Sequence, residues 1–261
     1  MNGVFARNLN AQLYALNVDD IRTAVEDFFG IRMKDKHLVY FDLEDTLWKH
    51  RGYLKSIANI FLKLPSKTDY LNREMVRLVK GYKRMPVEER IDLTAKVFEG
   101  TPLVYLEKFG DYLAGQISPF SSRFLEALYG LQTLMMSFDI KEFAKPTKNK
   151  LEAAGIKVDS SILNAVVLDD ELKTTRRLYS VAEGVKNWDG QTLKRPESKK
   201  KGLEVVMGET GTKPSELVIF NDKHPGESAV DGLRNEGATV IKSKEAETIL
   251  RRLVKAKAKS R

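Results

Sequence analysis

The stretch that most constrains this chain runs from residue 38 to residue 47 and reads LVYFDLEDTL. Its first four residues are apolar or aromatic, the pattern of a strand that is buried in a parallel sheet. Three carboxylates follow at once, at Asp42, Glu44 and Asp45. Three acids in four residues repel one another unless they share a proton or a cation, and such oxygen ligands suit Mg²⁺. The alternative interpretation is a solvated acidic turn ahead of a helix.

A second strand of the same kind is predicted near the end of the chain. The apolar residues 217–220 are followed by Asn221 and Asp222, then by a helical segment, Gly237 and another apolar strand. This strand, helix, strand order is typical of a parallel sheet, in which ligands bind at the carboxyl ends of the strands. We therefore expect Asp42 and Asp222 to converge on one divalent ion.

The order of strand, Asp42, acid, Thr46 and Leu47 resembles the first motif of the haloacid-dehalogenase-like hydrolases. The resemblance implies that Asp42 is a nucleophile that becomes an aspartyl-phosphate, and that Glu44 is the general acid and base. Two residues depart from the usual motif. Glu44 stands where Asp is normal, and Asp45 stands where Gly is usual.

The second motif of that family is a strand followed by Ser or Thr, and the predicted strand 131–136 (LQTLMM) followed by Ser137 matches it. The resemblance implies that the Ser137 hydroxyl holds the transferring phosphoryl group. In the phosphoserine-phosphatase-like branch two glycines normally follow, whereas this chain continues directly to Phe138 and Asp139. The missing glycines remove an easy close approach of the backbone to a phosphate.

The third motif is a lysine that neutralises the charges of the nucleophile and the phosphoryl group. Counting back from the fourth motif points to Lys199 at the start of a helix, with Lys200 and Lys201 as alternatives. The fourth motif supplies metal ligands, so the resemblance implies Mg²⁺ as the cofactor. Its predicted ligands are the Asp42 carboxylate, the main-chain carbonyl of Glu44, Asp222 and Glu227.

The expected fold class is α/β, with a three-layer Rossmann-like core around a mostly parallel sheet. The core is assigned to residues 38–48 and 119–250. Residues 49–118 show helical spacing of apolar residues and no convincing strand, which resembles the all-helical cap of the same branch, inserted after the first core strand. Residues 1–37 are expected to form a helical accessory segment, and residues 251–261 a basic C-terminal tail.

Local signals predict where several helices begin and end. Asp19 or Asp20 is expected to cap the first helix, and Gly30 to end it. Ser121 is expected to cap the helix that follows the cap domain. Pro146 is expected to interrupt the next helix, because proline lacks a backbone donor.

Composition excludes several classes of function. The chain contains no cysteine, which excludes disulfides, thiol catalysis and zinc–thiolate sites. No apolar run has the length of a membrane span, and no signal-type apolar core begins the chain, so a cytoplasmic location is expected. The net charge is +8, and part of it is concentrated in residues 251–261. Such a run can bind nucleic acid, although a solvated chain end is the commoner interpretation.

These observations lead to three hypotheses of different classes. The first is a Mg²⁺-dependent phosphatase that hydrolyses a small phosphorylated metabolite through an aspartyl-phosphate on Asp42. The second is a catalytically degenerate family member that acts as a binding or regulatory module, which the acids Glu44 and Glu227 and the missing glycines favour. The third is a nucleic-acid-binding protein that uses the basic C-terminal tail.

Overall fold

A computed structural model describes most of the chain outside the predicted cap. The described residues are 9–43, 45–48, 77, 81, 84–86, 89, 103–128, 130–137, 141–168, 176–189, 195–222 and 228–259. The greater part of the predicted cap, residues 49–118, therefore lies outside the described residues. Its described end is helix α6 (Leu103–Gly115).

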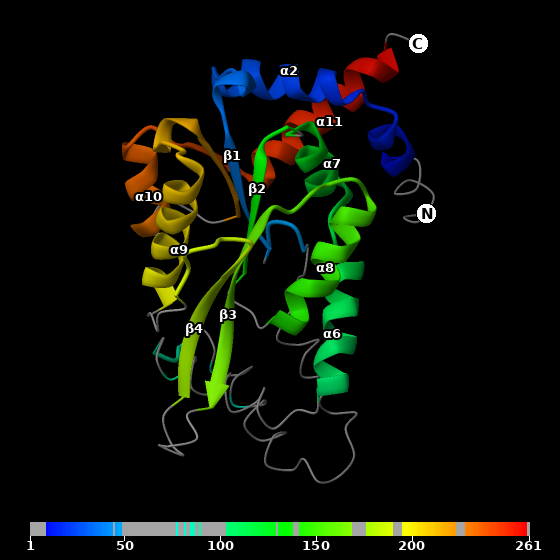
Figure 1. The fold of residues 1–261 in the computed structure, drawn as a ribbon. Helices are drawn as coiled ribbons and strands as arrows, with labels where there is room; N and C mark the ends of the chain where they lie inside the picture. The colour runs from blue at the N-terminus through cyan, green and yellow to red at the C-terminus, as the bar shows by residue number, and fades with distance from the viewer. Residues whose placement is uncertain are drawn as a thin grey trace.

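The described part of the chain contains a six-stranded sheet with the order β4-β3-β2-β1-β5-β6 (Figure 1). Its strands are β1 (Leu38–Asp42), β2 (Gln132–Ser137), β3 (Ser160–Leu168), β4 (Arg176–Glu183), β5 (Leu217–Asn221) and β6 (Thr239–Lys242). All neighbouring pairs are parallel except β3 and β4, which are antiparallel. This mostly parallel sheet confirms the predicted α/β class.

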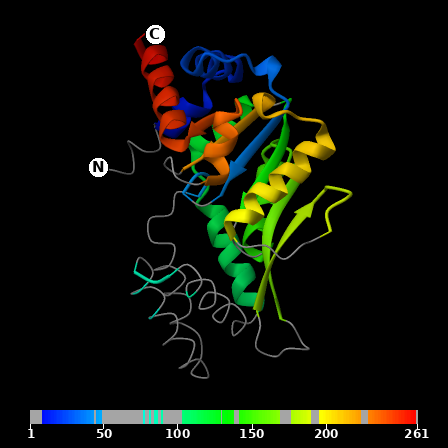
Figure 2. The same cartoon turned by 90° about the vertical axis from the view of Figure 1, so that its left-hand side faces the viewer.

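Helices cover both faces of the sheet, which makes three layers (Figures 1 and 2). The helices are α2 (Val18–Phe29), α7 (Pro119–Ala127), α8 (Lys141–Ala153), α9 (Arg195–Thr210), α10 (Ser228–Asn235) and α11 (Ser243–Lys259). Val39 and Phe41 of β1 belong to the apolar cluster that contains residues of α2, α7, α8 and α11. Leu38 and Tyr40 belong to a second cluster with α9 and α10. The alternation along β1 thus places one strand between two apolar cores.

Helix α2 begins at a different residue from the one expected. Asn17 is the N-cap of α2, and its side-chain oxygen accepts the backbone N–H of Asp19 at 3.0 Å. Asp19 and Asp20 occupy the first turn, where carboxylates stabilise the helix dipole. The expected end is confirmed, because Gly30 ends the helix with a φ of 63°.

The helix after the predicted cap also begins earlier than expected. Ser118, not Ser121, is the N-cap of α7, because Pro119 occupies the first helical position and fixes where the helix starts. The Ser121 hydroxyl instead donates to the carbonyl of Thr46 at 2.7 Å. This bond ties α7 to the loop that follows β1.

The expected interruption at Pro146 is wrong, because α8 runs through this residue. Proline removes one hydrogen bond, to the carbonyl four residues earlier, but burial of Ala144 before it and of Leu151 after it holds the helix in place. Thr147 and Leu151 are buried, and the indole N–H of Trp48 donates to Thr147 Oγ1 at 2.8 Å.

Residues 251–259 complete α11, so this stretch is a helix end and not a separate tail. The Arg251 guanidinium carbon lies 4.7 Å from the centre of the Phe120 ring. Lys257 Nζ donates to the carbonyl of Ala15 at 2.8 Å. Part of the basic charge at this end of the chain is therefore used in contacts within the molecule. Among the described helices, none combines the length and apolarity needed to span a membrane.

The two ends of the predicted cap meet at one place in the core. Trp48 and Ile117 form an antiparallel bridge. Beside it, the backbone N–H of Ser118 donates to the carbonyl of Leu47 at 2.8 Å. The chain therefore leaves the core and returns to it through a shared set of backbone bonds, directly after the acidic loop.

Candidate active site

Three of the predicted site residues lie together at the carboxyl ends of the strands. Asp42 ends β1, Ser137 ends β2, and Asp222 directly follows β5. Because β1 lies between β2 and β5, these residues come from three neighbouring strands, which are about 4.8 Å apart in a sheet. The pairing of Phe41 with Phe220 places Asp42 beside Asn221, one residue before Asp222.

This end of the sheet is also the point where the order of the strands reverses. After β1 the chain adds β2 and β3 on one side, and it then returns to add β5 on the other side. In open α/β sheets the ligand crevice lies outside the carboxyl ends of the strands at such a switch point. The acids therefore stand where this topology places a binding site.

The main electrostatic feature of the site is an ion pair between Asp42 and Lys199. Lys199 Nζ lies 3.4 Å from Asp42 Oδ1, and the two residues are 5% and 1% exposed. Burial of either charge alone would be costly, so each stabilises the charged form of the other. The pair couples the second turn of α9 to the end of β1.

The structure distinguishes Lys199 from its two neighbours. Lys200 and Lys201 are exposed, and Lys200 Nζ lies 3.7 Å from Glu204 Oε1 on the same helix. Lys199 is thus the member of this run that reaches the carboxylate at the end of β1.

Close packing of α9 on the sheet holds Lys199 near Asp42, and Gly202 permits it. Gly202 lies three residues after Lys199, on the same side of the helix. A Cβ atom at Gly202 would overlap Ile162 Cδ1 and would lie 3.0 Å from Ile162 Cγ2. Gly202 belongs to none of the four motifs, although a glycine one helical turn after the predicted lysine is a usable signal.

We expect Gly202→Ala to lower the free energy of unfolding by about 1–3 kcal/mol, because an added methyl group overpacks the contact with Ile162. Gly208→Ala is the matched control, since nothing lies within 4 Å of a Cβ at Gly208 in the same helix. That control should be neutral or stabilising by up to about 1 kcal/mol. Urea unfolding measures both, and equal effects of the two substitutions would contradict the close packing at Gly202.

The acidic loop contains a backbone conformation that explains one departure from the family motif. Asp45, at the position where Gly is usual, has a φ of 56°. Aspartate tolerates this left-handed conformation better than most residues, because its short polar side chain can bond locally. Asp45 thus adopts the left-handed backbone conformation that a glycine at this position would adopt without strain.

The structure tests only part of the predicted metal site. Asp42 and Asp222 lie on the same edge of the sheet, which fits two carboxylate ligands of Mg²⁺. Glu44 and Glu227 lie outside the described residues, as does the Ser137 side chain. Within the described ranges, no group of three or more His, Asp or Glu side chains is arranged to hold a metal ion. The complete ligand set therefore stays a prediction.

Comparison with known proteins gives a likeness in structure but not in sequence. No family model matches the sequence, and no curated protein matches it. The structure is similar to a crystal structure of a protein with unknown function from Bordetella pertussis Tohama I, at 15% identity and a TM-score of 0.51. That match covers 80% of this chain and 99% of the other.

A second similar structure is the unliganded probable phosphoserine phosphatase from Vibrio cholerae, at 11% identity and a TM-score of 0.50. The match covers 84% of this chain and 64% of that one. At such identities the likeness concerns the fold. The chain therefore shares its fold with these two structures.

Proposed function

We propose that this protein is a Mg²⁺-dependent phosphatase that hydrolyses a small phosphorylated metabolite through an aspartyl-phosphate on Asp42. The observation that carries the proposal is the buried contact of Asp42 Oδ1 with Lys199 Nζ at 3.4 Å. A carboxylate and a cation held together at the carboxyl ends of the strands support the roles of nucleophile and phosphate-binding group. The fold shared with a probable phosphoserine phosphatase supports the same activity.

In the proposed reaction Asp42 attacks the phosphorus atom of the ester. The new bond from the Asp42 oxygen to phosphorus forms as the bond from phosphorus to the leaving alkoxide breaks, and Glu44 gives this alkoxide a proton. Glu44 then takes a proton from the water that hydrolyses the aspartyl-phosphate. Lys199 and Ser137 orient the transferring oxygens, and the lysine offsets their negative charge.

The predicted metal ligands are the carboxylates of Asp42, Asp222 and Glu227 and the main-chain carbonyl of Glu44. When bound there, Mg²⁺ supplies positive charge that offsets the repulsion between carboxylate and phosphate.

Glu44 is the residue that favours the alternative of a degenerate binding or regulatory module. Its side chain is one methylene longer than the usual Asp, which moves the carboxyl group by about 1 Å. A displacement of that size can lower a rate about 100-fold. The proposal therefore predicts a slow enzyme or one with a narrow range of substrates.

The proposal is tested by measuring hydrolysis of an aryl phosphate and of a broad panel of phosphate esters. We expect turnover with Mg²⁺ to fall at least about 100-fold in EDTA, because a metal ion contributes several kcal/mol to such a transition state. Added Mg²⁺ should restore the rate. Absence of turnover over the whole panel would contradict the proposed phosphatase activity and would favour the binding or regulatory module. A hydrolysis rate that EDTA does not change would contradict the proposed dependence on Mg²⁺.

A further inference from the structure

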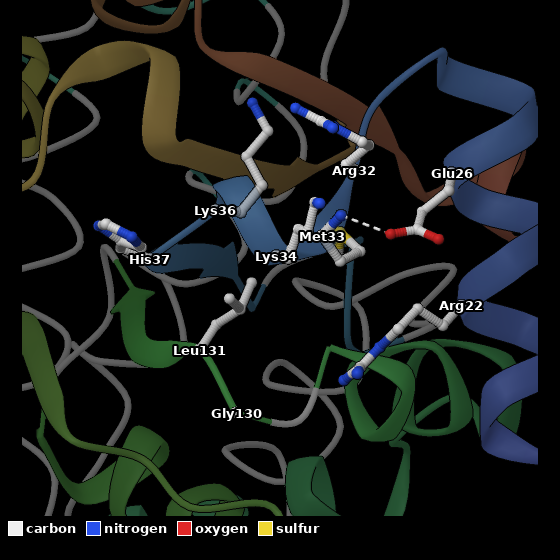
Figure 3. Close-up of a pocket in the computed structure, with 9 residues that line it drawn as sticks. All are labelled: Arg22, Glu26, Arg32, Met33, Lys34, Lys36, His37, Gly130 and Leu131. Atoms are coloured by element: carbon white, nitrogen blue, oxygen red, sulfur yellow. Dashed lines mark hydrogen bonds between the residues drawn. The ribbon is translucent and has the colours of Figure 1, made fainter.

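A cavity of about 560 Å³ opens at the edge of the sheet opposite to Asp42 (Figure 3). Its walls are α2, the segment around the short helix η1 (Met33–Asp35) and the turn before β2. His37 and Leu131, which line it, directly precede β1 and β2. The cavity therefore lies at the amino ends of the strands. The length of β1, about 13 Å for four residue steps, separates it from Asp42.

Cationic side chains dominate the lining of this cavity. Four lysine and arginine side chains line it together with one carboxylate: Arg22, Arg32, Lys34 and Lys36, with Glu26. The carboxylate is engaged, since Glu26 Oε1 accepts the backbone N–H of Met33 at 2.5 Å. The lining thus has an excess of positive charge.

Two more carboxylates, Asp35 and Glu216, lie close to the lining residues, and they pair with only part of the positive charge. Asp35 Oδ2 accepts from Arg32 Nε at 2.8 Å, and Glu216 Oε2 lies 3.6 Å from His37 Nδ1. Within the described part of the chain, Lys34 and Lys36 have no carboxylate at ion-pair distance.

Lys36 gives the cavity a buried cation. The residue is 8% exposed, and its Nζ donates to the carbonyl of Ser215 at 2.6 Å. An ammonium group has three donors, so one carbonyl does not satisfy it. Burial lowers the pKa of Lys36, and the nearby charges of Asp35 and Glu216 oppose this shift. An anion in the cavity would favour the charged lysine further.

The remaining lining is suited to the organic part of a ligand. Leu131 and the buried Met33 supply apolar surface, and both lie among the cationic residues that line the cavity (Figure 3). The volume falls in the range of small-molecule sites, which combine apolar walls with a few convergent polar groups.

We propose that this cavity binds a small phosphorylated molecule. Its phosphate contacts Arg32, Lys34 and Lys36, because lysine and arginine form strong charge-assisted bonds with phosphate oxygens. Its organic body lies against Leu131 and Met33. This site is separate from the proposed phosphatase centre. The proposal does not depend on whether that centre hydrolyses phosphate esters.

Calorimetric titration in EDTA tests the proposal, with ADP, adenosine and inorganic phosphate as probes. We expect ADP to bind more tightly than inorganic phosphate, and adenosine not to bind. Arg32→Gln with Lys34→Gln removes two cations from exposed positions and should weaken ADP binding at least about tenfold, because two charge-assisted hydrogen bonds are lost. Lys255→Gln with Lys259→Gln on α11 is the charge-matched control.

Each outcome bears on the site directly. Unchanged ADP affinity in the α11 control and in Lys199→Met, with the loss confined to the cavity variant, supports the proposal. Equal losses in the cavity variant and the α11 control would show attraction by net charge alone. A loss confined to Lys199→Met, in a sample that urea unfolding shows to be folded, would place the ligand at the proposed active site. Either result overturns the proposal, as does a lack of binding by ADP and phosphate.

Discussion

Asp42→Asn is expected to abolish turnover of every phosphate ester that the wild-type protein hydrolyses. An amide cannot form the aspartyl-phosphate, and removal of the nucleophile from a covalent mechanism costs on the order of 10⁴–10⁶ in rate. The substitution keeps the shape of a side chain that is 1% exposed, although it also removes the anion that pairs with Lys199. Single-turnover assays of both proteins with an aryl phosphate, in Mg²⁺, measure the loss.

Asp27→Asn is the matched control for this substitution, because Asp27 is an exposed carboxylate on α2. It should leave the rate unchanged. If Asp42→Asn turned over substrate at a rate within about tenfold of wild type, Asp42 would not be the nucleophile. Loss of folding is checked separately by the urea midpoint of the variant.

The second large effect concerns stability and does not depend on catalysis. Lys199→Met should lower the free energy of unfolding by about 3–5 kcal/mol, because it leaves the Asp42 carboxylate buried without its cation. Lys200→Met, beside it on the same helix, should cost no more than about 1 kcal/mol, since Lys200 is exposed. Urea unfolding in EDTA measures both variants without a contribution from a bound metal.

A double variant separates the ion pair from simple packing. Asp42→Asn with Lys199→Met removes both charges, so it should be more stable than Lys199→Met alone. If the double variant loses the sum of the two single losses, the two residues are not coupled. That result would contradict the importance of the 3.4 Å contact in the folded protein.

The sequence predicted the parts of the fold that rest on strong local patterns. The apolar runs at 38–41 and 217–220 became β1 and β5, and their carboxyl ends meet as the parallel order requires. Counting between motifs selected Lys199 from three adjacent lysines. The two strand predictions succeeded because an apolar run that ends in charged residues is typical of a buried parallel strand. The role of Lys199 stays a prediction.

Other features depend on tertiary contacts that a single sequence does not reveal. Pro146 lies inside α8 because packing around Thr147 and Leu151 compensates for one lost backbone bond. Ser121 is a residue type that commonly caps helices, yet its hydroxyl donates to the carbonyl of Thr46, which is distant in sequence. The role of Gly202 depends on the position of Ile162 on a strand distant in sequence. The basic cavity likewise combines residues from α2, η1 and the turn before β2.

The bridge between Trp48 and Ile117 has a consequence for how such a protein diversifies. Because the core itself joins the two ends of the insertion, the intervening segment does not have to fold in order to bring them together. Closing a longer loop across fixed ends adds little entropic cost. Segments of different length and sequence are therefore exchangeable at this junction while the sheet keeps its geometry.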